Sequence, residues 1–207
     1  MNREDFPMLS QDLIYFDNGA TTWKPQCVID KIVEYYSQYC ANAHRGDYGI
    51  SQKVDMMYEG VREKVRKFIH ASSSSEIVFT SGSTDGLNRI AFGYFSKKLK
   101  KGDEVLITDG EHASNVLPWF VLEKKIGIHV RYIPLNENHE VTLDGLKSCV
   151  NEKTKVISLA YVTNVIGDIR PIREIVDYAH QRGILVVVDG AQSVSHMKTD
   201  VVLDDID

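Results

Sequence analysis

The chain has 207 residues, of which 43% are apolar and 26% charged, and 24 basic against 29 acidic residues give a formal net charge of −5. This composition is that of an ordinary globular protein with a real hydrophobic core. The acidic balance and the lack of a basic stripe argue against a nucleic-acid partner. We also expect no membrane partner, because no apolar run approaches the roughly 20 residues of a spanning helix.

The three cysteines, Cys27, Cys40 and Cys149, are widely spaced. An odd count, with no apolar stretch of signal-peptide type in residues 1–10, favours free thiols in a reducing compartment. We therefore expect a cytoplasmic location. No Cys-x-x-Cys or His-x-x-x-His spacing occurs, so a structural zinc site is not expected.

The N-terminal part of the chain predicts an arm followed by two helices. Leu13–Phe16 is a short apolar run that ends in a polar loop at residues 17–22. Pro25 begins a helix that runs to about Tyr39, and Ser51 is expected to cap a longer helix. Six apolar residues of this second helix recur at helical spacing and are expected to be core, namely Val54, Met57, Tyr58, Val61, Val65 and Phe68.

From residue 77 onward, short apolar runs alternate with segments long enough for a helix. The runs are Ile77–Thr80, Val105–Thr108, His129–Ile133, Val156–Ala160 and Ile184–Val188. Their continuous apolar character fits strands that are buried on both faces. Strands that alternate with helices predict an α/β fold with a mostly parallel sheet. In such sheets, ligands bind beyond the carboxyl ends of the strands.

The first two strand ends carry hydroxyl groups and a histidine. A small-residue turn with Ser83 and Thr84 opens a helix, where free N–H groups could bind a phosphate. Taken alone, this segment fits a Ser/Thr helix cap better, because it matches neither of the known glycine-rich phosphate motifs. His112 could stack on a flat cofactor or transfer protons, although a solvated loop histidine is the simpler interpretation.

The later strand ends carry an amide and a carboxylate. Asn164 could donate a hydrogen bond to a ring substituent, or could be an ordinary turn asparagine. Asp189 ends a fully apolar strand, where a carboxylate needs a compensating partner such as a protonated ring nitrogen, a metal ion or nearby backbone. Gln192 could bond to the same ligand. Together, the four strand ends describe a pocket for a phosphate and a flat protonatable ring, and pyridoxal phosphate meets that description.

Six segments carry a family resemblance. In chain order they are Tyr15–Thr22, Ala43–Gly46, Ser81–Asn88, Glu111–Trp119, Val162–Gly167 and Val188–Gln192. Together they resemble the N-terminal half of cysteine desulfurases of the class V aminotransferase family, in particular the group that serves SUF iron–sulfur assembly. The resemblance implies a pyridoxal-phosphate-dependent transferase of fold type I, with a mostly parallel central sheet and flanking helices. Residues 1–50 would be an N-terminal arm and first helix, and residues 51–207 an incomplete cofactor-binding large domain.

The resemblance also implies roles for cofactor-binding residues. Ser83 and Thr84 would hold the cofactor phosphate, with Thr84 preferred. His112 would stack on the pyridine ring and act as a catalytic residue that moves protons. Asp189 would pair with the protonated ring nitrogen, and Gln192 would bond to the phenolic oxygen.

Substrate contacts are implied in the same way. Asn164 would position the cofactor and the substrate carboxylate, while Ala20, His44 and Arg45 would lie near the substrate entrance, close to a dimer partner. The chain departs from the common family pattern at three positions. These are Tyr48 and Ala113, where many relatives have histidine, and Asp85, where glutamate is usual.

The resemblance implies that the complete enzyme converts L-cysteine to alanine and leaves a persulfide for a sulfur-acceptor protein of iron–sulfur cluster assembly, acting as a homodimer. The family's cofactor-anchoring lysine, in a Ser-x-His-Lys motif, would follow Asp207, and Lys198 is not a convincing substitute. The sulfur-accepting cysteine lies in the family's C-terminal domain. We therefore expect a fragment that is inactive alone.

Three other interpretations stay open at this point. Another class V enzyme, such as selenocysteine lyase or kynureninase, would share the same cofactor cradle. A non-catalytic truncated module would keep the fold without the lysine. A nicotinamide-dinucleotide enzyme is disfavoured, because no Gly-x-Gly-x-x-Gly follows any predicted strand.

Overall fold

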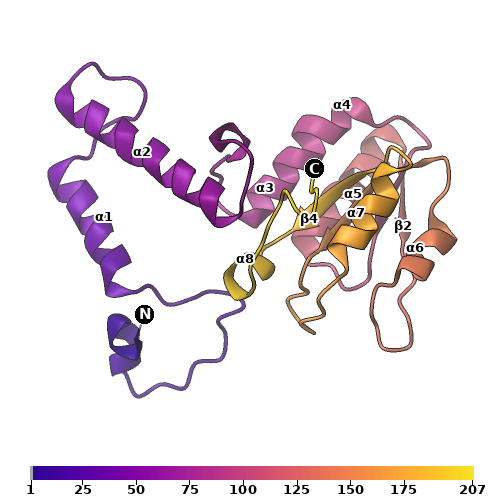
Figure 1. The fold of residues 1–207 in the computed structure, drawn as a ribbon, viewed down its shortest axis with the longest axis horizontal. Coiled ribbons are helices and arrows are strands. Elements are labelled where there is room, and N and C mark those ends of the chain that lie inside the picture. The colour runs from indigo at the N-terminus through magenta and orange to yellow at the C-terminus, as the bar shows by residue number, and fades with distance from the viewer. Residues whose placement is uncertain (1) are drawn as a thin grey trace. The chain divides into compact units, whose positions relative to one another are not determined.

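A computed structural model describes residues 2–207 and divides the chain into two compact units, residues 2–65 and 66–207 (Figure 1). The division expected after residue 50 falls in the first turn of helix α2 (Gly49–Phe68), whereas the compact units divide near the end of that helix. No helix in the described chain is long and apolar enough to cross a membrane.

The first unit contains an arm and the two predicted helices. The arm holds two short 3₁₀ turns, η1 (Arg3–Asp5) and η2 (Pro7–Ser10), and helix α1 (Gln26–Gln38) follows Pro25 as expected. The predicted cap at Ser51 is wrong, because α2 begins two residues earlier and Ser51 lies inside it. The buried Ser51 hydroxyl instead donates a hydrogen bond to the Asn42 carbonyl at 2.8 Å, which ties the preceding loop to the helix.

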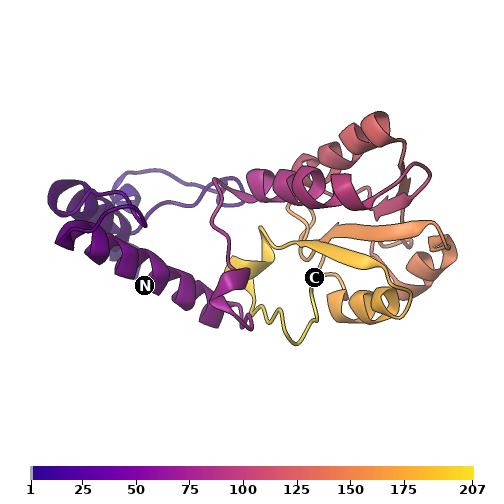
Figure 2. The same cartoon turned by 90° about the horizontal axis from the view of Figure 1, so that it is seen from above.

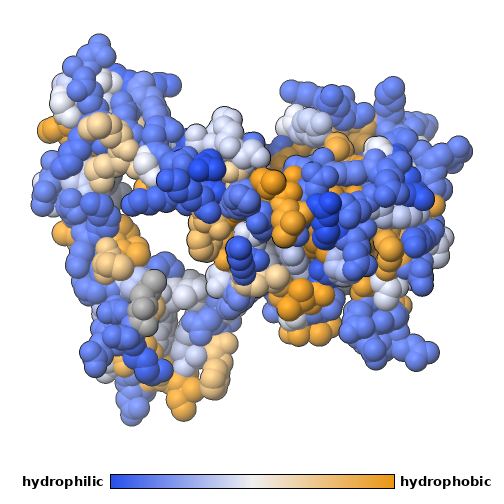
Figure 3. All heavy atoms as spheres, in the orientation of Figure 1, coloured by the Kyte–Doolittle hydropathy of each residue, from blue (hydrophilic) through white to orange (hydrophobic). Residues whose placement is uncertain are grey.

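The apolar stripe of α2 forms a helix as predicted, but it is not core in the described structure. Only Val54 is buried, whereas Tyr58, Val61 and Phe68 are exposed. Helical spacing reports which side chains share a face, and it does not report whether another element covers that face. Apolar side chains are therefore part of the molecular surface, as the space-filling view illustrates (Figure 3).

The second unit is built on a parallel four-stranded sheet, which confirms the predicted fold class. Its strands are β1 (Glu104–Ile107), β2 (His129–Tyr132), β3 (Thr154–Ala160) and β4 (Leu185–Asp189), in the order β2-β1-β3-β4. The strand predicted at Ile77–Thr80 is wrong, because the sheet of the described residues does not include it. An apolar run becomes a strand only when a neighbouring strand pairs with its backbone, and Val78 is 73% exposed.

Helices cover both faces of the sheet (Figure 2). Alternate residues of each strand serve opposite faces, so that Val105 and Ile107 pack with α5 (Ala113–Ile126), while Leu106 packs with α7 (Ile172–His180). The other helical elements are η3 (Ser74–Glu76), α3 (Ser83–Arg89), the π-helical segment η4 (Ile90–Phe95), α4 (Ser96–Lys98), α6 (Leu143–Cys149) and α8 (Ser193–His196). Burial on both faces explains the apolar runs of β1, β3 and β4. The expected burial of β2 on both faces is wrong, because β2 is an outer strand and is largely exposed.

The C-terminal segment is attached to this core through a histidine. His180, at the end of α7, contacts the Asp207 carboxylate through Nε2 at 2.8 Å and the Asp205 carboxylate through Nδ1 at 3.1 Å. The hydrogen bond to Asp207, together with that to Asp205, raises the pKa of His180 above its ordinary value, although partial burial opposes the shift. The protonated imidazole thus holds the segment against α7.

Two leucines of α5 provide a matched test of the core. Leu122 is 1% exposed and Leu117 is 60% exposed on the same helix. Leu122→Ala should lower the free energy of unfolding by about 2–5 kcal/mol, since it removes buried methyl groups and leaves a cavity. Leu117→Ala should change it by less than about 0.5 kcal/mol. Urea unfolding monitored by circular dichroism measures both, and equal losses in the two variants would contradict the assigned burial.

The His180 contacts predict a pH-dependent stability. A group whose pKa is raised by folding stabilises the folded state below its unfolded pKa, and this contribution disappears as the pH rises through the folded pKa. His180→Gln, which cannot carry the charge, should therefore cost more stability at about pH 6 than at about pH 9. Thermal unfolding of both proteins at the two pH values measures this difference. A cost that grows with pH would contradict the assigned contacts.

Candidate functional site

The carboxyl ends of β1, β3 and β4 lie side by side, because the three strands are neighbours and run in parallel. Ala160, at the end of β3, is the register partner of Asp189 at the end of β4. The Tyr161 N–H continues this pairing with a hydrogen bond to the Asp189 carbonyl at 2.9 Å. The segment that follows β3 therefore leaves the sheet beside Asp189, and the segment that follows β1 leaves the same edge one strand further away.

His112 is fixed at the start of α5, just beyond β1. Its Nδ1 accepts a hydrogen bond from the Ser114 N–H at 3.2 Å and so caps the helix. The neutral ring then carries its proton on Nε2, because a nitrogen that accepts cannot also hold the proton. Nε2 is the atom through which His112 can donate a proton to a ligand and take one back.

Ser114 connects His112 with the predicted phosphate-binding turn. Its Oγ lies 3.0 Å from His112 Nδ1 and 2.7 Å from Thr84 Oγ1. The structure thus brings Thr84 and His112 together, although 28 positions separate them in the sequence. Ser114 was not among the predicted site residues. A hydroxyl residue two positions after a strand-end histidine, at the start of a helix, is the signal that could have identified it.

The turn before α3 has room for a ligand. Gly82 lies before the helix with φ near 147°, a conformation that favours glycine, and a Cβ built there would meet nothing within 4 Å. Ser83 and Thr84 form the first turn of α3, where N–H groups have no acceptor within the helix. Asp85 bonds back to the Ser81 N–H at 3.3 Å and to Arg89 at 2.8 Å. The bond to Arg89, followed by that to Ser81, lowers the pKa of Asp85.

Asp189 is a buried carboxylate at the strand ends. The residue is 7% exposed, and its Oδ1 accepts a hydrogen bond from the Ala191 N–H at 2.9 Å. This bond occupies one carboxylate oxygen, so Oδ2 can accept from a cationic donor. Gln192 follows within three residues and immediately precedes α8.

Asn164 and His112 line the same hollow, whose volume is about 380 Å³. The hollow lies between the segment after β1, which contributes Asp109, and the loop after β3, which contributes Val165. Asn164 itself is exposed at the surface of this loop. The predicted meeting of the histidine and the asparagine at one edge of the sheet is therefore present in the structure.

The residues predicted at the substrate entrance, Ala20, His44 and Arg45, belong to the first unit and are all exposed. The His44 N–H donates to the Asp55 carboxylate, and its Nε2 lies 3.4 Å from a Glu59 carboxylate oxygen. These contacts tie the loop before α2 to that helix. The role of the three residues at the substrate entrance stays a prediction.

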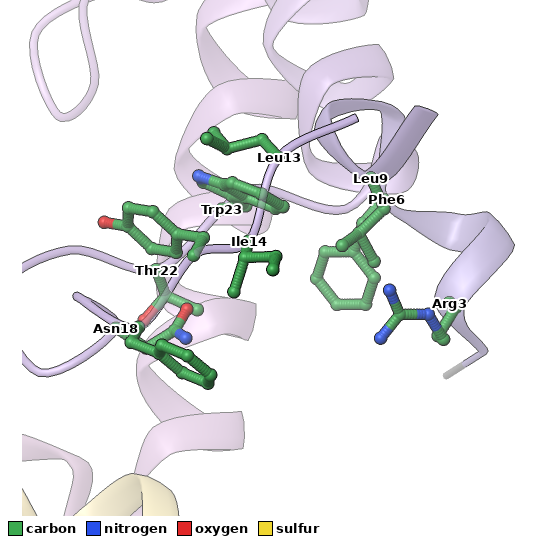
Figure 4. Close-up of a pocket in the computed structure, with 10 residues that line it drawn as sticks. Arg3, Phe6, Leu9, Leu13, Ile14, Asn18, Thr22 and Trp23 are labelled. Carbon is green, nitrogen blue, oxygen red and sulfur yellow. The ribbon is translucent and has the colours of Figure 1, made fainter. Parts of the chain in front are cut away.

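A second hollow, of about 430 Å³, lies within the arm of the first unit (Figure 4). It is lined mainly by apolar residues such as Phe6 and Ile14, and the rings of Tyr15 and Trp23 stack at 4.6 Å. The Tyr15 hydroxyl donates to the Thr21 carbonyl at 2.9 Å, which steadies the loop that carries Ala20. The side chains of this hollow mainly pack against one another, and few of them could take part in a reaction.

No cluster of histidine, cysteine and acidic residues suited to a metal ion is present in residues 2–207. The strand-end residues instead suit an organic ligand with an anionic end and a flat cationic ring. Gly82 and the first turn of α3 leave space and donors for the anion, and Asp189 offers a buried carboxylate for the cation. We call Thr84, His112, Ser114, Asn164 and Asp189 the strand-end site.

The chain is similar in sequence to proteins named as cysteine desulfurases. It is 42% identical over 201 residues to a probable cysteine desulfurase of Halalkalibacterium halodurans, which covers 95% of this chain and 50% of that protein. A probable cysteine desulfurase of Vibrio cholerae is also 42% identical, over 204 residues, with coverage of 96% and 50%. The chain thus spans about half the length of these curated relatives.

Solved structures agree with this result. The apo cysteine desulfurase of Thermococcus onnurineus superposes with a TM-score of 0.92 at 35% identity, covering 99% of this chain and 50% of that one. A cysteine desulfurase of Escherichia coli gives a TM-score of 0.90 at 33% identity, with coverage of 99% and 51%. The family profile described as Aminotransferase class-V matches residues 14–207. With its parallel sheet and strand-end site, the chain belongs to the class V aminotransferase family.

Proposed function

We propose that this chain is the N-terminal, cofactor-holding part of a pyridoxal-phosphate-dependent cysteine desulfurase. The observation that carries the proposal is that a histidine and a buried carboxylate lie at the carboxyl edge of the parallel sheet, and that a hydroxyl pair joins the helix of the histidine to the start of α3. The names of the relatives and the family match support the same activity.

The strand-end site fits pyridoxal phosphate at both of its ends. The open turn at Gly82 and the hydroxyls of Thr84 and Ser114 suit the phosphate. The buried carboxylate of Asp189 suits the ring nitrogen, since a nearby negative charge favours the protonated nitrogen. When bound, the cofactor supplies an electron sink for the bond-breaking step at the amino acid.

The other side chains of the site orient the ligands and handle protons. His112 presents Nε2–H, from which a proton can pass to a reacting group and return. Asn164 would orient the cofactor and the substrate carboxylate from the loop after β3, and Gln192 would bond to the phenolic oxygen. Ser83 would add a third hydroxyl donor for the phosphate. Ala20, His44 and Arg45 are proposed to contact substrate at its entrance.

For the whole protein, we propose conversion of L-cysteine to alanine, with a persulfide left on a cysteine for transfer to a sulfur-acceptor protein of iron–sulfur assembly. A homodimer and a cytoplasmic location belong to the same proposal. The names of the relatives support the activity, whereas the acceptor, the dimer and the location depend on the family resemblance alone. Each of these statements stays a prediction.

Loss of the buried carboxylate should weaken cofactor binding. Asp189→Asn keeps the side-chain shape and removes its charge, so the dissociation constant for pyridoxal phosphate should rise by about tenfold or more, as expected for one lost charge-assisted hydrogen bond. Titration followed by the absorbance of the cofactor measures this change. Asp177→Asn, at an exposed pair with Arg173 on α7, is the matched control and should bind like the parent chain.

Thr84→Val tests, in the same titration, whether the phosphate and the ring of the cofactor bind at different ends of the site. This variant should lose affinity for pyridoxal phosphate but not for pyridoxal, which lacks the phosphate, whereas Asp189→Asn should weaken both. Parent-like binding by Asp189→Asn, or equal effects of Thr84→Val on the two ligands, would contradict the proposed orientation.

The chain alone should release no alanine from L-cysteine when supplied with pyridoxal phosphate. None of the strand-end site residues is a lysine or a cysteine, and burial raises the pKa of Cys149 and disfavours its thiolate. Amino-acid analysis of the reaction mixture measures the product. Steady alanine release above a protein-free control would overturn this prediction.

A further inference from the structure

Glu111, which immediately precedes His112, is a buried acid outside the predicted site. Its side chain is 0% exposed, and both carboxylate oxygens accept hydrogen bonds. Oε1 accepts from Thr108 at 2.7 Å and from Arg170, while Oε2 accepts from Asn115 at 2.8 Å and from the Ala160 N–H at 2.7 Å. The carboxylate thus connects the end of β1, the start of α5 and the end of β3.

Arg170 makes the same connection from the loop after β3. Its side chain is 1% exposed, and besides Glu111 it donates to Thr108 Oγ1 at 2.7 Å. Arg170 Nε lies 3.7 Å from an Asp168 carboxylate oxygen. A planar guanidinium can reach these partners together, whereas a lysine ammonium is a single point of charge.

The loop that carries Asn164 is closed upon Arg170. The Arg170 N–H donates to the Tyr161 carbonyl at 3.0 Å, and the Thr163 N–H donates to the Asp168 carbonyl at 3.1 Å. The Asp168 N–H returns a bond to Thr163 Oγ1 at 3.0 Å. A shift of Arg170 would therefore move the base of the whole loop that carries Asn164.

A buried ion pair of this kind is a poor source of stability, because the cost of removing both charges from water offsets most of their attraction. It does fix geometry, since any displacement leaves a buried charge without its partner. Here Glu111 is the neighbour of His112 in the chain, and Arg170 closes the loop that carries Asn164. The pair thus couples the two loops that line the 380 Å³ hollow.

We propose that Glu111 and Arg170 are positioning residues, which hold His112 and Asn164 in one fixed geometry toward the cofactor. This inference rests on the proposed function for its ligand, but the coupling of the two loops can be measured without one. Glu111→Gln removes the charge and keeps the shape, and Arg170→Lys keeps the charge and removes the planar fork. Either variant should make both loops, the one after β1 and the one after β3, more mobile.

The first measurement is amide hydrogen exchange of the ligand-free chain, with two windows at residues 108–115 and 161–168. Both variants should speed exchange in both windows by about tenfold or more, while the buried strand residues Leu106 and Ile157 exchange as in the parent chain. The ¹⁵N signals of His112 should change from the Nε2–H tautomer to a mixture. Glu104→Gln is the matched control, since Glu104 pairs with the part-exposed Arg131 at 2.7 Å at the opposite end of β1.

Faster exchange only in the window nearer to the substituted residue would overturn the proposal. An equal rise in the strands would also overturn it, because it would indicate a general loss of stability. The second measurement is the titration with pyridoxal phosphate, in which both variants should bind about tenfold more weakly than the Glu104→Gln control. Binding equal to the control would overturn the positioning role toward the cofactor. If the parent chain binds no pyridoxal phosphate, the proposed function fails, whereas the exchange and tautomer results still decide the coupling of the loops.

Discussion

Parallel pairing of β1, β3 and β4 is the constraint on which the site depends. Because these strands run in one direction, their carboxyl ends lie along one edge of the sheet, and the segment after β3 begins next to Asp189. Helices on both faces bury most of β1, β3 and β4, so that the polar groups open to a ligand lie where these strands end. The chemistry is thereby confined to a few loop residues on a rigid support.

Those loop residues are tied together by polar contacts of two kinds. Hydroxyls join the start of α3 to the start of α5 through Thr84 and Ser114, and charges join the loops after β1 and β3 through Glu111 and Arg170. The first connection lies open to a ligand, whereas the second is buried beneath the loops. Ser114, which is open to a ligand, and Glu111, which positions its neighbours from below, thus lie only a few residues apart at the start of α5.

The sequence predicted the local structure better than the contacts between distant segments. The four strands from β1 to β4 and the residues at their ends were identified because apolar runs and their polar ends lie next to each other along the chain. The strand at Ile77–Thr80 and the core role of the α2 stripe were wrong, since both depend on a partner that local pattern does not report. Ser114 and Arg170 were missed for the same reason, because their partners lie 30 and 59 positions away.

The contact of Asp207 with the sheet has a consequence for self-association. Besides binding His180, the Asp207 carboxylate accepts a hydrogen bond at 2.8 Å from the N–H of Val186 in β4, which is an outer strand of the sheet formed by the described residues. Outer strands with open N–H groups are templates on which other chains can add strands and aggregate. A negatively charged side chain bonded to this backbone blocks that position and repels an incoming strand. The same carboxylate that fastens the C-terminal segment thus also occupies one of the hydrogen-bonding groups along this outer strand.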